Sequence, residues 1–367
     1  MTGRERILTA LDLKEPDMVP VWEQAFNEPS IIGIARYFVE DSSKLPEPKL
    51  VMDMTDQEKF QLISALLTLI RELDLDGATA TSLAPRKRLK QDYIQDSLGV
   101  IYRLSQVGEP YPTNGPVKEP GDLKDFKIRS PVPEDFLMLE ILRSTFPDKA
   151  ITYHMPCSFK VSWLLLGSLE KLLMNYILNP NFVKELAKIS TEYCLALIEI
   201  ALQKGADFII LEGDLAHNPG PMMNPAHYDE FILPYHYEIC QKVHKLGGKV
   251  VKHSDGNITP LIPSLIQAGF DGIHPIQPQC MDIAQTKENF GDKLCLLGNI
   301  DCAYLLVFGT PEQVEMEVSE TIKKAGTNGG YILSSSNSIH PGCKPENYLA
   351  LVRSARKYGK YPLKTSN

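Results

Sequence analysis

Short apolar runs with the character of buried strands alternate with longer segments of helical periodicity through this chain of 367 residues. Eight strand-like runs can be counted, and each one after the first few is followed by a clear helix. Strands that alternate with helices pair in parallel through right-handed crossovers, and eight such units close naturally into a barrel. The sequence therefore predicts an α/β protein whose single domain, residues 1–367, is a (β/α)8 TIM barrel.

The expected strands are rich in β-branched residues and finish in polar residues or turns. They occupy residues 19–23, 76–82, 150–157, 206–214, 249–252, 272–277, 293–301 and 329–337. Apolar spacing and helix-start signals predict helices over residues 1–14, 56–73, 134–145, 159–176, 181–204, 224–247, 260–268, 282–290 and 311–325, with a last one from 345. Pro234 should kink the long helix that it interrupts.

One segment departs from this alternation. Residues 91–118 contain an alternating β-forming run, from Ile94 to Leu104, with turn residues at both ends. This pattern predicts an antiparallel hairpin inserted after the second strand. An open doubly wound sheet is the main alternative to the barrel, but such sheets usually have a glycine-rich phosphate loop after an early strand, and the sequence has none.

The composition, with 43% hydrophobic and 23% charged residues, is that of an ordinary globular protein. A net charge of -8 argues against a broad nucleic-acid surface, because phosphate binding needs clustered cations. We find no apolar run of membrane-spanning length and no signal peptide, so we expect a cytoplasmic protein that binds neither membranes nor nucleic acid. The seven scattered cysteines include no CxxC pair, which is typical of free thiols.

The run that ends in His253 and Asp255 has the clearest chemical content. Residues two apart share one face of a strand, so both side chains should point the same way where the strand opens into its loop at Gly256. A histidine beside a carboxylate at this position suits a metal or an acid/base pair. The alternative is a structural histidine hydrogen-bonded to a turn aspartate.

In a barrel, the carboxyl ends of all the strands meet at one mouth. The polar strand-end residues that we expect to face this mouth are Glu23, Ser82, Cys157, Glu212, Asp214, His253, Asp255, Gln277, Asn299, Asp301 and Asn337. We assign catalysis to His253, Asp255, Glu212 and Asp214. For substrate binding, we expect Trp22, Glu23, Met155, Asn299 and Asn337.

Five motifs in register resemble the uroporphyrinogen decarboxylase superfamily over nearly the whole chain, most strongly from Ala206 onward. They are Glu212-Gly-Asp-Leu-Ala, Asn224-Pro with Glu230-Phe-Ile-Leu-Pro, His253-Ser-Asp-Gly, Gly298-Asn-Ile-Asp and Pro345-Glu-Asn. The resemblance implies a (β/α)8 barrel with its site at the mouth. It also implies one of two chemistries, which are decarboxylation of a tetrapyrrole and methyl transfer to or from a corrinoid.

The departures from the decarboxylase pattern favour methyl transfer. Decarboxylases of this superfamily have an arginine-rich loop after the first strand, which pairs with the carboxylates of their substrate. The same place in this chain reads Trp22-Glu-Gln-Ala-Phe-Asn-Glu and has no arginine before Arg36. A polyanionic substrate would meet the wrong sign of charge there.

Within the methyltransferase branch, enzymes that act on thiols bind zinc through an HxCG motif and a distant cysteine. This chain has His253, Asp255 and Asn337 at those positions, a harder ligand set that suits an oxygen-bearing substrate. Related demethylases imply zinc held by two acids and a histidine, which here would be Asp214, or alternatively Glu212, together with Glu230 and His253. His274 could also face the mouth, although a structural role beside Pro275 is the simpler interpretation.

The resemblance thus implies a demethylase that moves a methyl group from a small O-methylated substrate, such as an aryl methyl ether, to cobalt. The sequence has no DxHxxG corrinoid motif, so we expect the cobamide to arrive on a separate corrinoid protein. Three alternatives stay open: methyl transfer from a methylcorrinoid to tetrahydrofolate or a thiol, with zinc on Cys302 and Cys343, a metal-free decarboxylase, and a binding protein without catalysis. The oligomeric state is also open, a homodimer included.

Overall fold

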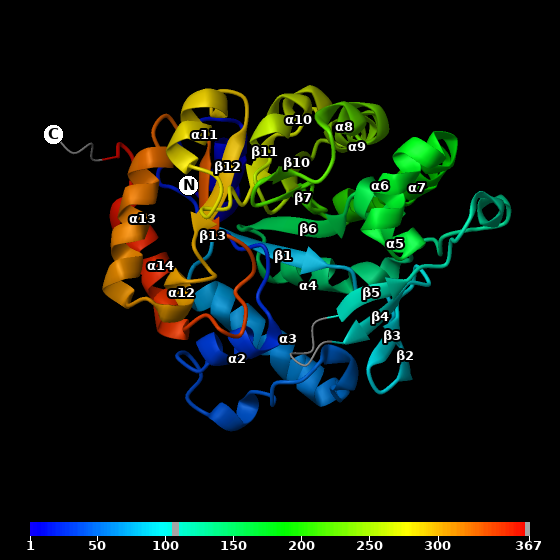
Figure 1. Cartoon of the computed structure of the whole chain (residues 1–367). Coiled ribbons are helices and arrows are strands. Elements are labelled where there is room, and N and C mark those ends of the chain that lie inside the picture. Colours follow the sequence, from blue (N-terminus) through cyan, green and yellow to red (C-terminus); the bar gives the residue numbers. More distant parts are fainter. Residues whose placement is uncertain (105–109, 364–367) are drawn as a thin grey trace.

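The computed structural model describes residues 1–104 and 110–363 and has a parallel sheet at its centre (Figure 1). Seven strands pair side by side in the order β1-β6-β7-β10-β11-β12-β13, and each paired neighbour runs parallel. Their bounds are β1 Gly77–Thr81, β6 Ala150–Pro156, β7 Phe208–Glu212, β10 Lys249–His253, β11 Gly272–His274, β12 Cys295–Ile300 and β13 Tyr331–Ser335. The predicted barrel is confirmed.

The eighth position is filled by the segment 19–23, which joins the last strand to the first. Val21 forms a parallel bridge with Leu333 of β13, and the backbone N–H of Trp22 donates to the Leu333 carbonyl at 3.0 Å. On its other side, Asp76 N–H donates to the Val21 carbonyl at 2.9 Å, directly before β1. The segment was predicted as a strand, and it closes the barrel with only this short ladder.

Helix α1 (Gly3–Leu11) lies under the amino end of the barrel. Its buried residues Ile7, Ala10 and Leu11 pack with the inward-facing side chains of the strands. These include Trp22, Phe208, Ile210, Val251, Cys295, Leu297 and Ile332. Because this cluster fills the lower half of the barrel, polar side chains can face inward only near the carboxyl ends of the strands.

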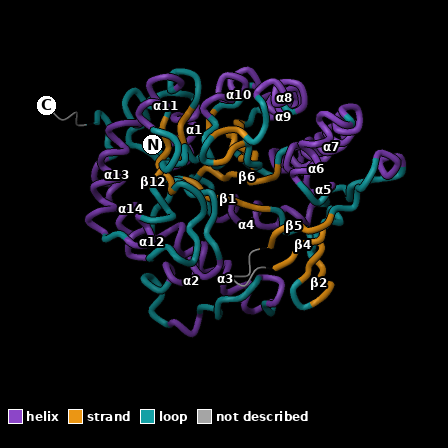
Figure 2. Tube along the Cα trace, viewed as in Figure 1, coloured by secondary structure: helices purple, strands orange, loops and turns teal. Residues whose placement is uncertain are grey.

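The other helices surround the sheet, as Figures 1 and 2 show. Those that follow strands or cover them are α3 Asp56–Glu72, α4 Leu137–Thr145, α5 Ser158–Leu166, α6 Leu169–Leu178, α7 Pro180–Gln203, α8 Pro225–Phe231, α9 Leu233–Lys245, α10 Ile262–Ala268, α11 Ile283–Phe290, α13 Pro311–Ala325 and α14 Pro345–Tyr358. Two short helices, α2 Glu28–Ala35 and α12 Leu305–Phe308, lie within segments for which we predicted neither a helix nor a strand.

Two predicted helices are divided, each for a local reason. The one over 159–176 ends as α5 at Gly167, whose φ of 69° places it in the left-handed region, and restarts as α6. The one over 224–247 separates into α8 and α9 at Ile232, because Pro234 cannot donate a backbone hydrogen bond to the preceding turn.

A single helix of membrane-spanning length and apolarity is absent from the described residues, while α5 and α6 together meet those criteria but bend by 97°.

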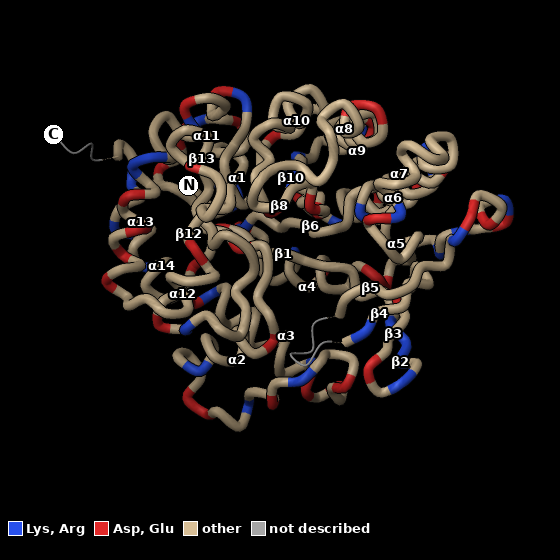
Figure 3. The backbone as a smooth tube through the Cα atoms, viewed as in Figure 1, with Lys and Arg blue, Asp and Glu red and all other residues tan. Residues whose placement is uncertain are grey.

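The insertion after β1 is larger than the predicted hairpin. Four antiparallel strands, β2 Lys87–Lys90, β3 Tyr93–Gln95, β4 Ile101–Leu104 and β5 Pro110–Asn114, form a separate sheet in sequence order. The predicted hairpin over 91–118 covers β3 to β5 but does not include β2. The four residues of β2 are exposed and mostly charged, so they show no alternation of apolar and polar residues. The part of the predicted hairpin at 105–109 lies outside the described residues. Figure 3 shows charged residues at β2, on the outer helices and on the outer loops.

Candidate metal centre

His253 stands at the end of β10 and faces the barrel interior, two residues above Val251 of the inner core. It is buried, with 3% of its surface exposed. The turn that follows depends on Gly256, whose φ is 83° and whose added Cβ would lie 2.5 Å from the backbone of Ala216. Because Gly256 packs this closely against Ala216, the loop turns back over the mouth and carries Asp255 with it.

Three potential ligand atoms converge at this point. His253 Nε2 lies 3.9 Å from an oxygen of Asp214 and 3.9 Å from Asp255 Oδ1. Ligand atoms of the three residues all lie within 4.8 Å of one another. One nitrogen and two carboxylates at this spacing fit a divalent metal such as zinc after a small adjustment of rotamers.

The surrounding hydrogen bonds orient the two carboxylates. The backbone N–H of Asp255 donates to Asp214 Oδ1 at 2.9 Å, and the side-chain amide of Asn337 donates to Asp255 Oδ2 at 2.7 Å. The other oxygen, Asp255 Oδ1, is buried and has no hydrogen-bond partner among the described residues. A buried carboxylate oxygen without a partner is costly, and a bound cation would satisfy it.

The electrostatics of the three residues differ. Burial holds the pKa of His253 well below its usual value, and the neighbouring His274 adds to this effect, so the imidazole is neutral. Burial, followed by the charges of Asp214 and Glu212, raises the pKa of Asp255 to about 7. A neutral imidazole with a free lone pair is the form that binds metal, whereas crowded carboxylates attract a cation.

The ring of His253 is held by His274, for which we expected a structural role. His253 Nδ1 lies 2.8 Å from Nδ1 of His274 on β11, and both rings are buried. Only one hydrogen can occupy this contact. If Nε2 of His253 is to bind a metal, its Nδ1 carries that hydrogen and donates it to His274. Periodicity gave no sign of this pair, because the two residues meet only through the pairing of β10 with β11.

Glu212 belongs to a separate polar group on the neighbouring strand end. Lys160 at the start of α5 forms an ion pair with both of its oxygens. Burial favours a higher pKa for Glu212, but the charges of Lys160 and His154 outweigh it and the pKa is lowered. Its carboxylate is therefore ionised and occupied by Lys160. Lys160 was not identified from the sequence, although its place at the first turn after a strand end was a usable signal.

Glu230 does not join the metal group. It lies near the end of α8, its side chain is 53% exposed, and it pairs with Lys184 of α7 at 2.8 Å. Of the expected set Asp214, Glu230 and His253, the structure therefore brings together Asp214 and His253 without Glu230, and Asp255 lies in the third place beside them. Helix α8 presents Glu230 to the outside of the molecule, and the sequence spacing to His253 could not reveal that direction.

Two expected substrate-binding residues lie in the core instead. Trp22 is fully buried below the mouth, against Phe208 and edge-on to His274. Met155 faces outward into the layer between sheet and helices, because side chains alternate along β6 and His154 takes the inward position. His154 contacts Gln24 at 3.1 Å. Neither Trp22 nor Met155 is placed to touch a substrate at the mouth.

The remaining predicted residues lie at strand ends. Glu23 is buried and hydrogen-bonded to Ser335 of β13. Asn299 is buried at the end of β12, where its amide donates to the Ile276 carbonyl at 2.9 Å. Asn337 contacts the metal group through Asp255, as described above. The structure therefore brings together Asp214, His253, Asp255 and Asn337.

Cys302 and Cys343, the thiol alternative, lie in adjacent loops outside this group. Cys343 Sγ lies 3.5 Å from the Cys302 carbonyl, and Ser336 contacts Cys302 Sγ at 3.3 Å. Burial raises the pKa of Cys302 to about 11 and that of Cys343 to about 12. Both are therefore protonated thiols at neutral pH.

The profile described as "Uroporphyrinogen decarboxylase (URO-D)" matches residues 93–358. The chain belongs to the uroporphyrinogen decarboxylase family. Among its relatives in this family is a uroporphyrinogen decarboxylase of Coxiella burnetii, 24% identical over 288 residues, which cover 72% of this chain and 74% of the relative. Another is the methylcobamide:CoM methyltransferase MtaA of Methanosarcina barkeri, 25% identical over 363 residues, which cover 97% and 98%.

A solved structure supports the architecture. A methyltransferase from Methanosarcina mazei superposes with a TM-score of 0.76 at 20% identity, covering 98% of this chain and 99% of that one. The predicted family is thus confirmed, together with its barrel. The identities to the decarboxylase and to the methyltransferase are nearly equal, so the choice between their chemistries depends on the site.

Proposed function

We propose that the protein is a methyltransferase that removes a methyl group from a small O-methylated substrate and transfers it to the cobalt of a separate corrinoid protein. The similarity to a methylcobamide:CoM methyltransferase along nearly the whole chain supports a corrinoid-linked methyl transfer. The observation that carries the proposal is the convergence of Asp214, His253 and Asp255 at the barrel mouth, without a thiolate.

Asp214, His253 and Asp255 would hold a divalent metal, for which zinc fits the donor set. When bound, such a metal supplies a Lewis acid to the oxygen that the methyl group leaves. A ligand set of oxygen and nitrogen is harder than the thiolate sets that activate thiols, and it is better matched to an ether oxygen. This match favours an oxygen-bound methyl group, such as that of an aryl methyl ether.

The reaction is a displacement at the methyl carbon. Co(I) of the partner contributes the electron pair of the new cobalt–carbon bond and becomes Co(III), while the carbon–oxygen bond breaks and its pair stays on oxygen. An ether oxygen leaves poorly as an anion, so it must be protonated or charge-stabilised as the bond breaks. Asp214, His253 and Asp255 would contribute by holding the metal, because Nε2 of His253 would be a ligand and its Nδ1 hydrogen is donated to His274. Asn337 and the Asp255 backbone N–H orient the two carboxylates.

The mouth is unsuited to a tetrapyrrole with many carboxylates. Glu28 but no arginine follows the first strand before Arg36, where a decarboxylase would need arginines, and Asp214 and Asp255 lie across the mouth. Lys160, the cation that contacts Glu212, is already paired. The cobamide, in contrast, would be held by its own protein and would need only access to the mouth.

The test is a single-turnover assay with the purified chain, zinc, anisole and Co(I) cobalamin or a corrinoid protein encoded beside the gene. Methylation of cobalt, followed by the loss of Co(I) absorbance, together with release of phenol, is the expected result. Methanethiol and uroporphyrinogen serve as alternative substrates. Decarboxylation of uroporphyrinogen without a cobamide, or methyl transfer from methylcobalamin to a thiol but never from any ether, would overturn the proposal.

A further inference from the structure

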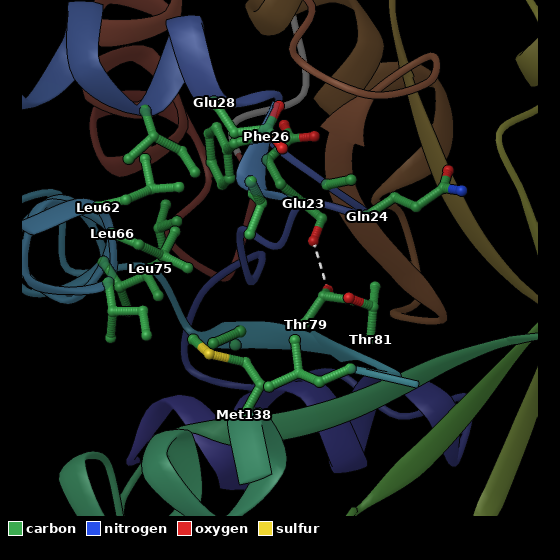
Figure 4. A pocket seen from close by; sticks show the side chains of 18 of the residues that line it. Glu23, Gln24, Phe26, Glu28, Leu62, Leu66, Leu75, Thr79, Thr81 and Met138 are labelled. Carbon is green, nitrogen blue, oxygen red and sulfur yellow. Dashed lines mark hydrogen bonds between the residues drawn. The ribbon is translucent and has the colours of Figure 1, made fainter. Parts of the chain in front are cut away.

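An apolar cavity lies beside the barrel mouth, at the seam between the segment 19–23 and β1 (Figure 4). The backbone hydrogen bond from Asp76 to Val21 holds the two chains together at the bottom of the seam. Nearer the mouth, a side chain makes the hydrogen bond between the two chains instead. Thr79 Oγ1 of β1 donates to the Glu23 carbonyl at 2.7 Å. Residues of α2 and α3 line the opposite side of the cavity.

The cavity has a volume of about 270 Å³. Its walls are mostly aliphatic and aromatic, and they include Phe26, Ile31, Leu62, Leu66, Leu75 and Met138. An apolar cavity of about 150 Å³ can hold benzene, so this one has room for a single ring with small substituents. Glu28 and the half-exposed Lys59 line it as well, and Lys59 is paired with Asp56 at 3.2 Å.

The polar side of the cavity is formed by Glu23 and Gln24, and it is linked to the candidate metal centre. Glu23 Oε2 lies 2.8 Å from the hydroxyl of Ser335, which in turn lies 2.6 Å from the carbonyl oxygen of Asn337. The side chain of Asn337 donates to Asp255. Hydrogen bonds through Ser335 and Asn337, at the end of β13, therefore connect Glu23 to Asp255.

The donors and acceptors around Glu23 indicate that its carboxyl group carries a proton. The Asn337 carbonyl can only accept, so Ser335 must use its single hydroxyl hydrogen there. The contact between Ser335 Oγ and Glu23 Oε2 then requires a hydrogen from the carboxyl group. The other oxygen, Oε1, accepts from the Ser335 backbone N–H at 2.9 Å. Burial supports the same state, since it raises the pKa of Glu23 to about 8 even though the Ser335 backbone N–H donates to its carboxyl group.

We propose that this cavity binds the ring of the methyl donor, that the donor is an uncharged aryl methyl ether of one ring, and that Glu23 forms an uncharged wall beside the ring. The inference rests on the proposed function for the identity of the ether, but the cavity and its polarity do not depend on the metal centre. An apolar ring gains from the aliphatic walls, while a charged group would face desolvation without a free counter-ion. The methoxy group would lie toward Glu23 and Gln24, the side that adjoins the mouth.

The first experiment measures binding without metal or cobamide. Calorimetric titration with anisole should give a dissociation constant at least tenfold lower than titration with 2-methoxyethanol, which has the same ether group without a ring. Leu66→Trp should fill the cavity and weaken anisole binding at least tenfold. Leu67→Trp is the matched control, since Leu67 neighbours Leu66 on α3 but does not line the cavity. Equal affinity in both tryptophan variants would overturn the assignment.

The second experiment uses pH and does not depend on the Trp variants folding. An anisole ring that displaces water from Glu23 disfavours its ionised form, so affinity should be flat below pH 8 and fall by up to tenfold per pH unit above it. Glu23→Gln keeps both contacts with Ser335 and cannot ionise, so its affinity should stay flat. Cys302, Cys343 and Tyr348 are the other titratable groups near Glu23, along with Glu28 and Lys59.

These outcomes separate the two proposals. A fall above pH 8 that persists in Glu23→Gln would assign the titration to another group and overturn the role of Glu23. Failure of wild-type protein to bind anisole would overturn the cavity as a donor site. Anisole binding that follows the expected pattern, with no methyl transfer to Co(I) in the single-turnover assay, would support the cavity as a ring site and overturn the proposed function instead.

Discussion

His253 and His274 share a single hydrogen between their Nδ1 atoms at 2.8 Å, at the paired ends of β10 and β11. This contact fixes the direction of the His253 ring and leaves its Nε2 facing Asp214 and Asp255. Residues that orient a ligand in this way commonly change metal affinity without touching the metal. His274 is thus a positioning residue in the proposed centre.

His274→Ala should therefore lower zinc affinity by about 10- to 100-fold, because His253 loses the partner that sets its tautomer and ring angle. Competition with a chromophoric chelator measures this change. His236→Ala is the control, since His236 is equally buried but contacts Tyr228 between α8 and α9. The control should lose stability and keep its zinc affinity. Unchanged affinity in His274→Ala would remove the positioning role.

His253→Ala should lower the single-turnover rate of methyl transfer by about 100-fold or more, because a ligand of the metal that would stabilise the leaving oxygen is lost. Asp255→Ala should cost a comparable factor if it binds the same metal. The measurement is the rate of cobalt methylation beside the thermal midpoint of each variant. A His253→Ala protein that melts early but transfers methyl at the wild-type rate would assign His253 a structural role only.

Asp214→Asn should bind less than half of the zinc that wild-type protein binds after dialysis, because one of three ligands is weakened. Glu212→Gln should keep its zinc, since Lys160 occupies that carboxylate. Glu230→Gln should also keep its zinc, because Glu230 is exposed and pairs with Lys184. The zinc content of the three proteins shows which of the three carboxylates binds the metal. Loss of zinc in Glu230→Gln would restore the ligand set that the sequence predicted.

Glu23 should make stability depend on pH. Its pKa in the folded state, about 8, exceeds the ordinary value of 4.5, so the folded chain holds a proton that the unfolded chain releases. The stabilisation is complete below pH 4.5 and is lost as pH rises through 8, by on the order of 1–4 kcal/mol. Urea denaturation from pH 4.5 to 9 should show this slope in wild type. A slope of equal size in Glu23→Gln would contradict it.

Asp76 should contribute strongly to the stability of the barrel where the segment 19–23 meets β1. It is 1% exposed, accepts from Arg6 at 3.0 Å and Arg356 at 2.9 Å, and also accepts from the Val21 backbone N–H. Asp76→Ala should destabilise the fold by about 3–5 kcal/mol, because it leaves these donors unpaired. Asp17→Ala, which removes an exposed partner of Arg6, should cost less than about 1 kcal/mol. Urea midpoints of the two variants test this difference.

The alternation of strands and helices was readable from the chain because each pattern is local. Runs such as Ala150–Pro156 or Lys249–His253 satisfy the period and β-branched bias of a buried strand without reference to any neighbour. Parallel pairing and closure then follow from general rules of connection. The end of β10 was readable for the same reason, since His253, Asp255 and Gly256 lie within four residues. The insertion was only partly predicted, because the exposed β2 strand is defined by its partner β3 and not by its own residues.

Tertiary structure decided which of the strand-end residues meet. Alternation along β6 turned Met155 outward, the direction of α8 carried Glu230 away from the centre, and strand pairing brought His274 against His253. The cavity beside Glu23 is bounded by residues of α3 and of α2, a helix that the sequence did not indicate. Periodicity specifies the face on which a side chain lies within its own element. Contact between elements depends on register, tilt and the packing of residues far apart in the chain, and only the folded barrel fixes these.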